Sequence, residues 1–143
     1  MKAKKKFYMS CHLAGRKYHD ADEVFDDLHV GTILNLKREH GNPYDPDAIR
    51  VIYEDGYGEN FVLGYIPQDL NSELAMFLDM GWKKIFECRI CKITPEAHFE
   101  QQILLSIKIL NRKGIEKTES SPAVHKKSGA DTQTINPFEE IQK

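Results

Sequence analysis

The sequence lacks the features that identify membrane and secreted proteins. No apolar run approaches the ~20 residues needed to span a bilayer, so we do not expect a membrane protein. The lysine-rich start, residues 1–6, is not followed by the apolar stretch of a secretory signal, because Tyr8, Ser10 and His12 interrupt it. These absences predict a cytoplasmic protein in which residues 1–6 are a basic N-terminal extension.

Cysteine is scarce as well. Three cysteines, an odd number, fit a reducing compartment better than a disulfide framework. Cys88 and Cys91 form a single C-x-x-C, but residues three apart on an extended segment point to opposite faces, and a structural zinc needs four ligands. We expect reduced, buried thiols and no metal or other cofactor. A zinc site that also uses Cys11 and His12 is the weaker alternative.

The chain has neither an excess of positive charge nor a catalytic motif. Its net charge is −2, whereas a protein that grips long DNA usually carries a clear positive excess. A small pocket for one strand end needs only a few cations. The histidines are scattered outside any H-E-x-x-H helix or nucleophile elbow, and Gly56-Tyr57-Gly58 lacks the G-K-[ST] of a phosphate loop. We therefore do not expect an enzyme.

Short strand-like segments dominate the chain. Alternating or β-rich patterns predict strands over residues 7–14, 32–39, 48–53, 60–66, 82–93 and 101–111. Residues 20–28 fit a short helix, and residues 68–80, which follow a proline, fit the main helix. This order predicts a mostly β fold with α insertions (α+β), a small antiparallel barrel over residues 7–112. Residues 114–143 lack periodicity and apolar content, so we expect a disordered tail.

A polar turn stands between two of the predicted strands and is the most informative segment. We call residues 41–47, Gly-Asn-Pro-Tyr-Asp-Pro-Asp, the hook. Its two X-Pro steps favour turns, because proline fixes its own φ and restricts the preceding residue. The hook should therefore present the amide of Asn42, the ring of Tyr44 and the carboxylate of Asp45 in a preformed geometry. It is either a recognition site or a well-made hairpin connection.

Aromatic and cationic residues stand at other predicted strand ends. Tyr18 and Tyr65 lie near glycine or proline, as the hook tyrosine does, and Arg16 and Lys17 precede Tyr18. Single-stranded nucleic acid is bound by aromatic stacking, worth ~1–3 kcal/mol per base, and by cations on its phosphates. The hook carboxylate would repel phosphates unless it accepts a hydrogen bond from a specific donor. A 3′-terminal hydroxyl is such a donor, and an internal nucleotide of DNA offers none there.

Three blocks in this order resemble the HIRAN domain family: Leu13-Ala-Gly-Arg-Lys-Tyr-His19, the N-P-Y-D-P-D-A-I-R-V run from Asn42, and Leu63-Gly-Tyr-Ile-Pro67. The resemblance covers residues 7–112. It implies a modified OB-like barrel that binds DNA and has no ATPase of its own, since that activity resides in other domains of the larger members. In the family, the aspartate of the turn reads the free 3′-hydroxyl of a single strand, and the resemblance implies this role for Asp45.

The residues expected to bind nucleic acid are Arg16, Lys17, Tyr18, His19, Asn42, Tyr44, Asp45 and Tyr65. His19, Gly41 and Gln68 depart from the family pattern, and one cation fewer implies weaker binding. The expected partner is single-stranded DNA, or its 3′ end, in repair, replication or a mobile element. A helicase-type ATPase or another repair protein is a candidate protein partner. The alternative is a protein-interaction scaffold on a barrel that does not bind nucleic acid.

Overall fold

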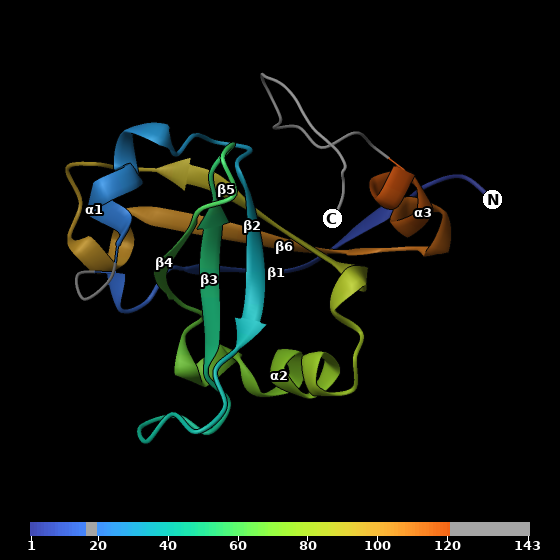
Figure 1. Cartoon of the computed structure of the whole chain (residues 1–143), viewed down its shortest axis with the longest axis horizontal. Coiled ribbons are helices and arrows are strands. Elements are labelled where there is room, and N and C mark those ends of the chain that lie inside the picture. Colours follow the sequence, from blue (N-terminus) through green and yellow to red (C-terminus); the bar gives the residue numbers. More distant parts are fainter. Residues whose placement is uncertain (17–19, 121–143) are drawn as a thin grey trace.

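A computed structural model describes residues 1–16 and 20–120 (Figure 1). The strands are β1 Lys5–His12, β2 Ile33–Arg38, β3 Ile49–Glu54, β4 Asn60–Tyr65, β5 Phe86–Ile93 and β6 Ile103–Leu110. The α-helices are α1 Ala21–Val24, α2 Ser72–Asp79 and α3 Arg112–Ser120. Single 3-10 turns occupy Phe25–Asp27, Gln68–Leu70, Lys83–Ile85 and Phe99–Gln101. Strands and helices therefore fall where the sequence patterns place most of them.

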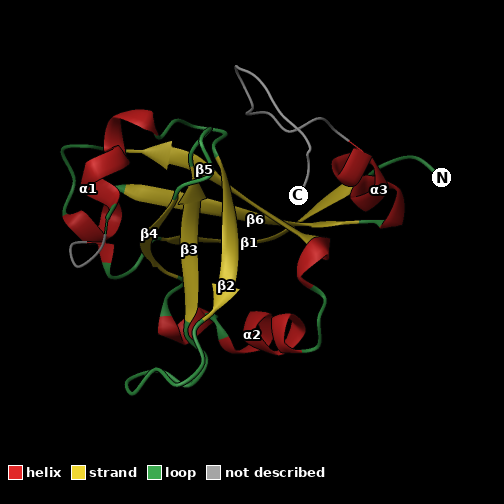
Figure 2. Ribbon diagram, in the orientation of Figure 1, coloured by secondary structure: helices red, strands yellow, loops and turns green. Residues whose placement is uncertain are grey.

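The six strands form one antiparallel sheet in the order β1-β6-β5-β2-β3-β4. The chain after β1 returns to β4, because the amide of Ala14 donates to the carbonyl of Tyr65 at 2.9 Å and the carbonyl of Ala14 accepts from the amide of Tyr65 at 2.8 Å. The sheet thus curls until its two outer strands meet. β2 and β3 cross in front of β1 and β6, with the helices at the margins (Figures 1 and 2). This arrangement confirms the mostly β fold with helical insertions.

The core lies inside the curled sheet and is built by alternating residues. Its largest fully buried side chains include Leu13, Ile49, Leu63, Ile90, Ile103, Leu105 and Ile107. Alternation buries every second residue of β6 from Ile103 to Ile107, as the period of a strand requires. Gly64 permits the closest backbone approach, because a Cβ on it would lie 2.3 Å from the carbonyl oxygen of Ala14. A glycine is therefore required where the chain after β1 meets β4.

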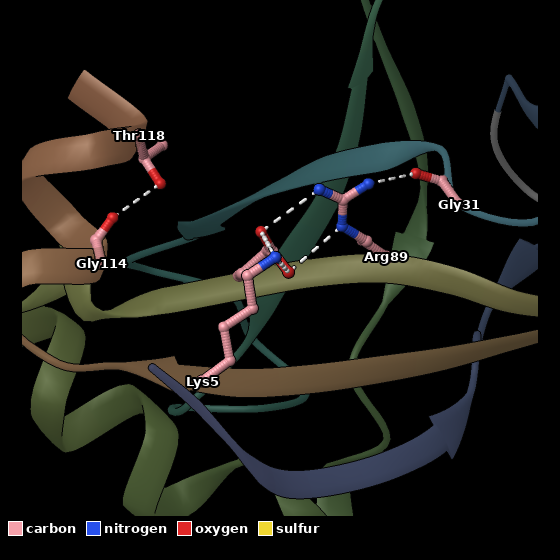
Figure 3. Close-up of polar contacts among 6 residues, drawn as sticks. Lys5, Gly31, Arg89, Gly114 and Thr118 are labelled. Atoms are coloured by element: carbon pink, nitrogen blue, oxygen red, sulfur yellow. Dashed lines mark hydrogen bonds and ion pairs between the residues drawn. The ribbon is translucent and has the colours of Figure 1, made fainter. Parts of the chain in front are cut away.

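The C-terminal part of the domain differs from the expected disorder. Residues 112–120 form helix α3, so the expectation is wrong over 114–120, while residues 121–143 lie outside the described residues. Asn111 accepts bonds from the amides of Gly114 at 2.7 Å and Lys4 at 3.0 Å, which attaches the helix start to the chain before β1. Thr118 donates to the Gly114 carbonyl within the helix (Figure 3). The contact between Lys4 and Asn111 joins residues 107 positions apart, so no local pattern signals it.

Two other boundaries also shift. The predicted strand 82–93 begins only at Phe86, because Gly81 adopts a φ of 90° and the next residues form the turn Lys83–Ile85. The basic extension, residues 1–6, overlaps the first strand, since β1 starts at Lys5 and pairs it with Leu110.

None of the described helices has the length and apolar content needed to cross a membrane.

The three cysteines differ in exposure. Cys11 and Cys88 are buried, whereas Cys91 is exposed, so the expectation of buried thiols is wrong for Cys91. Cys91 lies at a bulge of β5, where the pairing with β6 shifts by one residue. Burial raises the pKa of Cys11 to about 11 and also raises that of Cys88, so both thiols stay protonated at neutral pH. Within residues 1–16 and 20–120 no three potential metal ligands cluster.

Candidate nucleic-acid interface

The hook is a preformed turn at the end of the β2–β3 hairpin. The side-chain oxygen of Asn42 accepts bonds from the amides of Tyr44 at 2.8 Å and Asp45 at 3.0 Å. Gly41 supplies the positive φ, 80°, that lets the chain turn into this motif. Farther along, the Asp45 carboxylate accepts from the amide of Asp47 at 2.9 Å. The backbone of the hook is therefore fixed by its own side chains before any ligand arrives.

Arg38, the last residue of β2, supports the hook from its base. Its guanidinium donates to the carbonyl of Ala48 at 2.7 Å and to that of Pro46 at 3.0 Å. The same group pairs with Asp79 at the end of α2, at 2.9 Å. The Arg38 side chain thus connects the two ends of the hook to each other and to α2.

Glu39 joins the hook to the sheet. Its carboxylate accepts bonds from the hydroxyl of Tyr65 at 2.5 Å, from Nε of Arg50 at 2.8 Å and from the amide of Asn42 at 3.0 Å. The bond from Tyr65, followed by that from Arg50, lowers the pKa of Glu39 and keeps it ionised. Burial, with the bond to Glu39, raises the pKa of Tyr65, so its hydroxyl keeps the donated proton. One carboxylate thus positions two expected site residues, Asn42 and Tyr65.

Asn71 fixes the orientation of the Asp45 carboxylate. The amide of Asn71, a side chain only 1% exposed before the first turn of α2, donates to the second oxygen of Asp45 at 2.8 Å. Tyr44 is 87% exposed, and its carbonyl accepts a long bond from Gln68 at 3.4 Å. The hook therefore offers solvent an aromatic ring beside a carboxylate of fixed orientation.

Arg16 does not lie where a surface cation was expected. It is 3% exposed, and its guanidinium carbon lies 5.0 Å from the ring centre of Phe25 and 5.2 Å from that of Phe99. Its Nη2 pairs with Asp22 at 2.9 Å. The charge is enclosed by side chains from segments far apart in the sequence, which a reading of neighbouring residues does not reveal. Arg16 packs the start of its loop and presents no cation at the surface.

Three further expected site residues, Lys17, Tyr18 and His19, lie outside the described residues. The residue Gly15, which precedes this segment, lies close to Tyr65, because it follows the Ala14–Tyr65 bridge. A Cβ on Gly15 would lie 3.5 Å from the ring of Tyr65. The carboxylate of Glu100 accepts a bond from the amide of Gly15 at 3.0 Å and fixes the start of this loop.

The structure thus brings Asn42, Tyr44, Asp45 and Tyr65 into one connected region, and adds residues that the sequence interpretation missed. The additional residues are Arg38, Glu39, Arg50 and Asn71. Two of them left a signal, since Glu39 and Arg50 are charged residues in the strand runs that flank the hook on either side. Arg38 is likewise a charged residue of the first run, but neither its pair with Asp79 nor the contact of Asn71 with Asp45 could be predicted, because both depend on the packing of α2 against the hairpin. What this region can do is stack a planar group and accept a hydrogen bond beside it.

The chain is similar in sequence and in fold to known proteins. A model of the HIRAN domain matches residues 6–109. A Fanconi-associated nuclease 1 homolog from Oryza sativa subsp. japonica is 36% identical over 89 residues, which are 62% of this chain and only 8% of the rice protein.

Two crystal structures share the fold. A Lactobacillus plantarum protein superposes with a TM-score of 0.63 and 24% identity over 78% of this chain and 100% of its own. The HIRAN domain of human HLTF gives a TM-score of 0.51 and 19% identity over 81% of this chain and 87% of its own. At these identities the two structures show that the fold is shared.

Proposed function

Because this chain belongs to the HIRAN domain family, a family of DNA-binding domains, we propose that it is a non-catalytic module that binds single-stranded DNA at its 3′-hydroxyl end. The hook and its surroundings, Asn42, Tyr44, Asp45 and Tyr65, form the binding site in this proposal. From the sequence alone, the proposal also assigns Lys17, Tyr18 and His19 to DNA binding.

The carboxylate of Asp45 is the observation that carries the proposal. Its two oxygens offer about four acceptor positions, and one bond from Asp47 and one from Asn71 occupy two of them. The carboxylate is therefore oriented and still able to accept from a ligand. A terminal 3′-hydroxyl supplies a donor, whereas an internal phosphodiester brings only negative charge against the carboxylate. This chemistry favours a free strand end over any internal position.

The aromatic residues supply the remaining binding energy. The exposed ring of Tyr44 can stack on a base, a contact worth ~1–3 kcal/mol that tolerates any sequence. Tyr65 is fixed by its bond to Glu39, so it loses little side-chain entropy when a ligand binds. A module of this kind would recognise a strand end with little preference for base identity.

The proposed setting is DNA repair or replication. One protein with a related segment is named as a nuclease, but the matched part is 8% of its length, so its nuclease activity is not transferred to this chain. In the proposal, the module holds a strand end while an enzyme partner of helicase or repair type acts on the DNA. The proposal assigns no chemical step to the module itself.

Fluorescence anisotropy with 5′-labelled oligo(dT) tests end recognition directly. A strand with a 3′-phosphate should bind roughly ten- to a hundredfold more weakly than one with a 3′-hydroxyl, because a hydrogen bond to a charged group contributes ~1.5–3 kcal/mol. Asp45→Asn should weaken the hydroxyl strand and remove most of the discrimination. Asp47→Asn is the matched control, since only the backbone amide of Asp47 contacts the Asp45 carboxylate.

Two results would reject the proposal. Equal affinity for the two strand ends excludes 3′-hydroxyl recognition, even if some DNA binding survives. No binding to either strand would favour the alternative of a protein-interaction scaffold.

A further inference from the structure

A groove of about 1210 Å³ opens beside β2. It exists because β2 pairs with β5 only through Ile33 and Leu34 and then diverges from it. Beyond that point the edge of β2 faces the end of α2, the turn Lys83–Ile85 and the last turns of α3, and residues from all of these line the groove. In Figure 1, α2 and α3 lie on the side of β2 away from β3.

A row of residues connects the hook region to this groove. Tyr65 of β4, Arg50 of β3 and Lys37 of β2 are register partners on three adjacent strands. Directly opposed residues of antiparallel strands share a face, and adjacent strands are ~4.8 Å apart, so the row spans about 10 Å. Its first member belongs to the proposed end site, and its last member, Lys37, lines the groove.

Two lysines are the cations available to a ligand along this path. Lys37 and Lys83 are exposed, both line the groove, and neither has an ion pair within residues 1–16 and 20–120. Arg38 and Lys84 also line it, but they pair with Asp79 and Glu119. Available positive charge therefore lies at both walls of the groove.

The acids of the groove are mostly compensated. Asp79 and Glu119 are held by the pairs just described, and Glu87 is paired with Lys5 at 3.1 Å and with Arg89 at 3.1 Å. Figure 3 shows how the Lys5 and Arg89 side chains converge from β1 and β5. Glu54 is the lining acid with no cation partner among the described residues, and it lies at the opposite end of β3 from Arg50.

We propose that the nucleotides 5′ to the terminal one run along the Tyr65–Arg50–Lys37 row into this groove. Lys37 and Lys83 contact their phosphates, and Leu78 and Phe86 offer apolar walls for the bases. This proposal rests on the proposed function, because binding of the 3′ end at the hook sets the direction of the strand. It adds a second subsite, for several upstream nucleotides of any sequence, to the site that reads the end.

A length series of 3′-hydroxyl oligo(dT) tests the second subsite, with competition against a labelled strand as the readout. For the unmodified protein, affinity should rise from two to about eight nucleotides and then level off, within the ~4–16 nucleotides that one OB-type fold covers. The K37Q/K83Q double variant should bind the two-nucleotide strand normally. For the eight-nucleotide strand it should lose roughly ten- to thirtyfold at 0.1 M salt, and its salt slope should fall by about 1.4, because each phosphate contact on a single strand contributes ~0.7.

Lys92→Gln is the matched control, because Lys92 is an exposed lysine of β5 that does not line the groove. Equal affinity for all lengths, or a length effect that the double variant retains, would overturn the second subsite. Either result leaves discrimination between 3′-hydroxyl and 3′-phosphate untouched, so end recognition would stand. Loss of that discrimination with a preserved, lysine-dependent length effect would reject end recognition and keep the groove.

Discussion

Replacing Glu39 with glutamine tests whether one carboxylate holds the hook against the sheet. Glutamine has the same shape, but it removes the charge and places an NH2 group where one oxygen now accepts. Glu39 accepts from Tyr65, Arg50 and Asn42, and all three are donors. The variant can satisfy only part of this set, so at least one donor loses its partner.

The expected loss of stability is about 2 kcal/mol at neutral pH. A hydrogen bond to a charged group contributes ~1.5–3 kcal/mol, and three such bonds would sum to much more if they were buried and independent. These bonds are not independent, because they share one carboxylate. They are also not fully buried, because the side chains of Glu39 and Arg50 are 21% and 35% exposed, and solvent screens their pair. With an m-value of about 2 kcal/mol/M, the midpoint of urea unfolding should fall by roughly 1 M.

The pH dependence gives the sharper test. The pKa of Glu39 is lowered from its ordinary value of 4.5, so its contribution is complete above that value and is lost as pH falls through the lowered one. The difference between Glu39→Gln and the unmodified protein should therefore be constant from pH 7 to 5 and shrink progressively as the pH falls below 4.5. Urea titrations across this range measure it, with Glu54→Gln, an exposed strand glutamate, as the control. A difference that does not change with pH would refute the role of the charge.

Two further predictions concern packing and thiol chemistry. Gly64→Ala should destabilise the domain by about 1–3 kcal/mol, because its Cβ would collide with the backbone at 2.3 Å. Gly56→Ala is the control and should change the urea midpoint little, because the space around Gly56 is open. Equal effects of the two substitutions would contradict the close approach at Gly64. A maleimide added to the folded protein should modify Cys91 quickly, and it should modify Cys11 and Cys88 only after unfolding, since these two are buried. Mass spectrometry counts the labels. Rapid labelling of all three cysteines would show that the core is open.

The hook shows how much a local sequence determines. Two prolines, Asn42 and Gly41 fix a turn through dihedral limits and hydrogen bonds that span at most three residues. The alternating strands and the helix after Pro67 follow from equally local periodicity. For this reason the fold class, most strands and the exposed ring of Tyr44 could be predicted from the sequence.

The remaining features depend on residues that only folding brings together. Arg16 lies in an exposed-looking cationic run, yet two phenylalanines and Asp22 enclose it. Helix α3 is fixed through Asn111 by the chain before β1, more than a hundred residues away.

The partners within the hook region are of the same kind. Glu39 reaches Tyr65 across 26 positions, and Asn71 reaches Asp45 across 26 as well. Such pairs depend on strand register and on how α2 packs against the hairpin, and no short-range pattern in the chain encodes either one. The sequence by itself therefore determined the hook and the strands, and the tertiary structure decided which charges support the hook and which are buried.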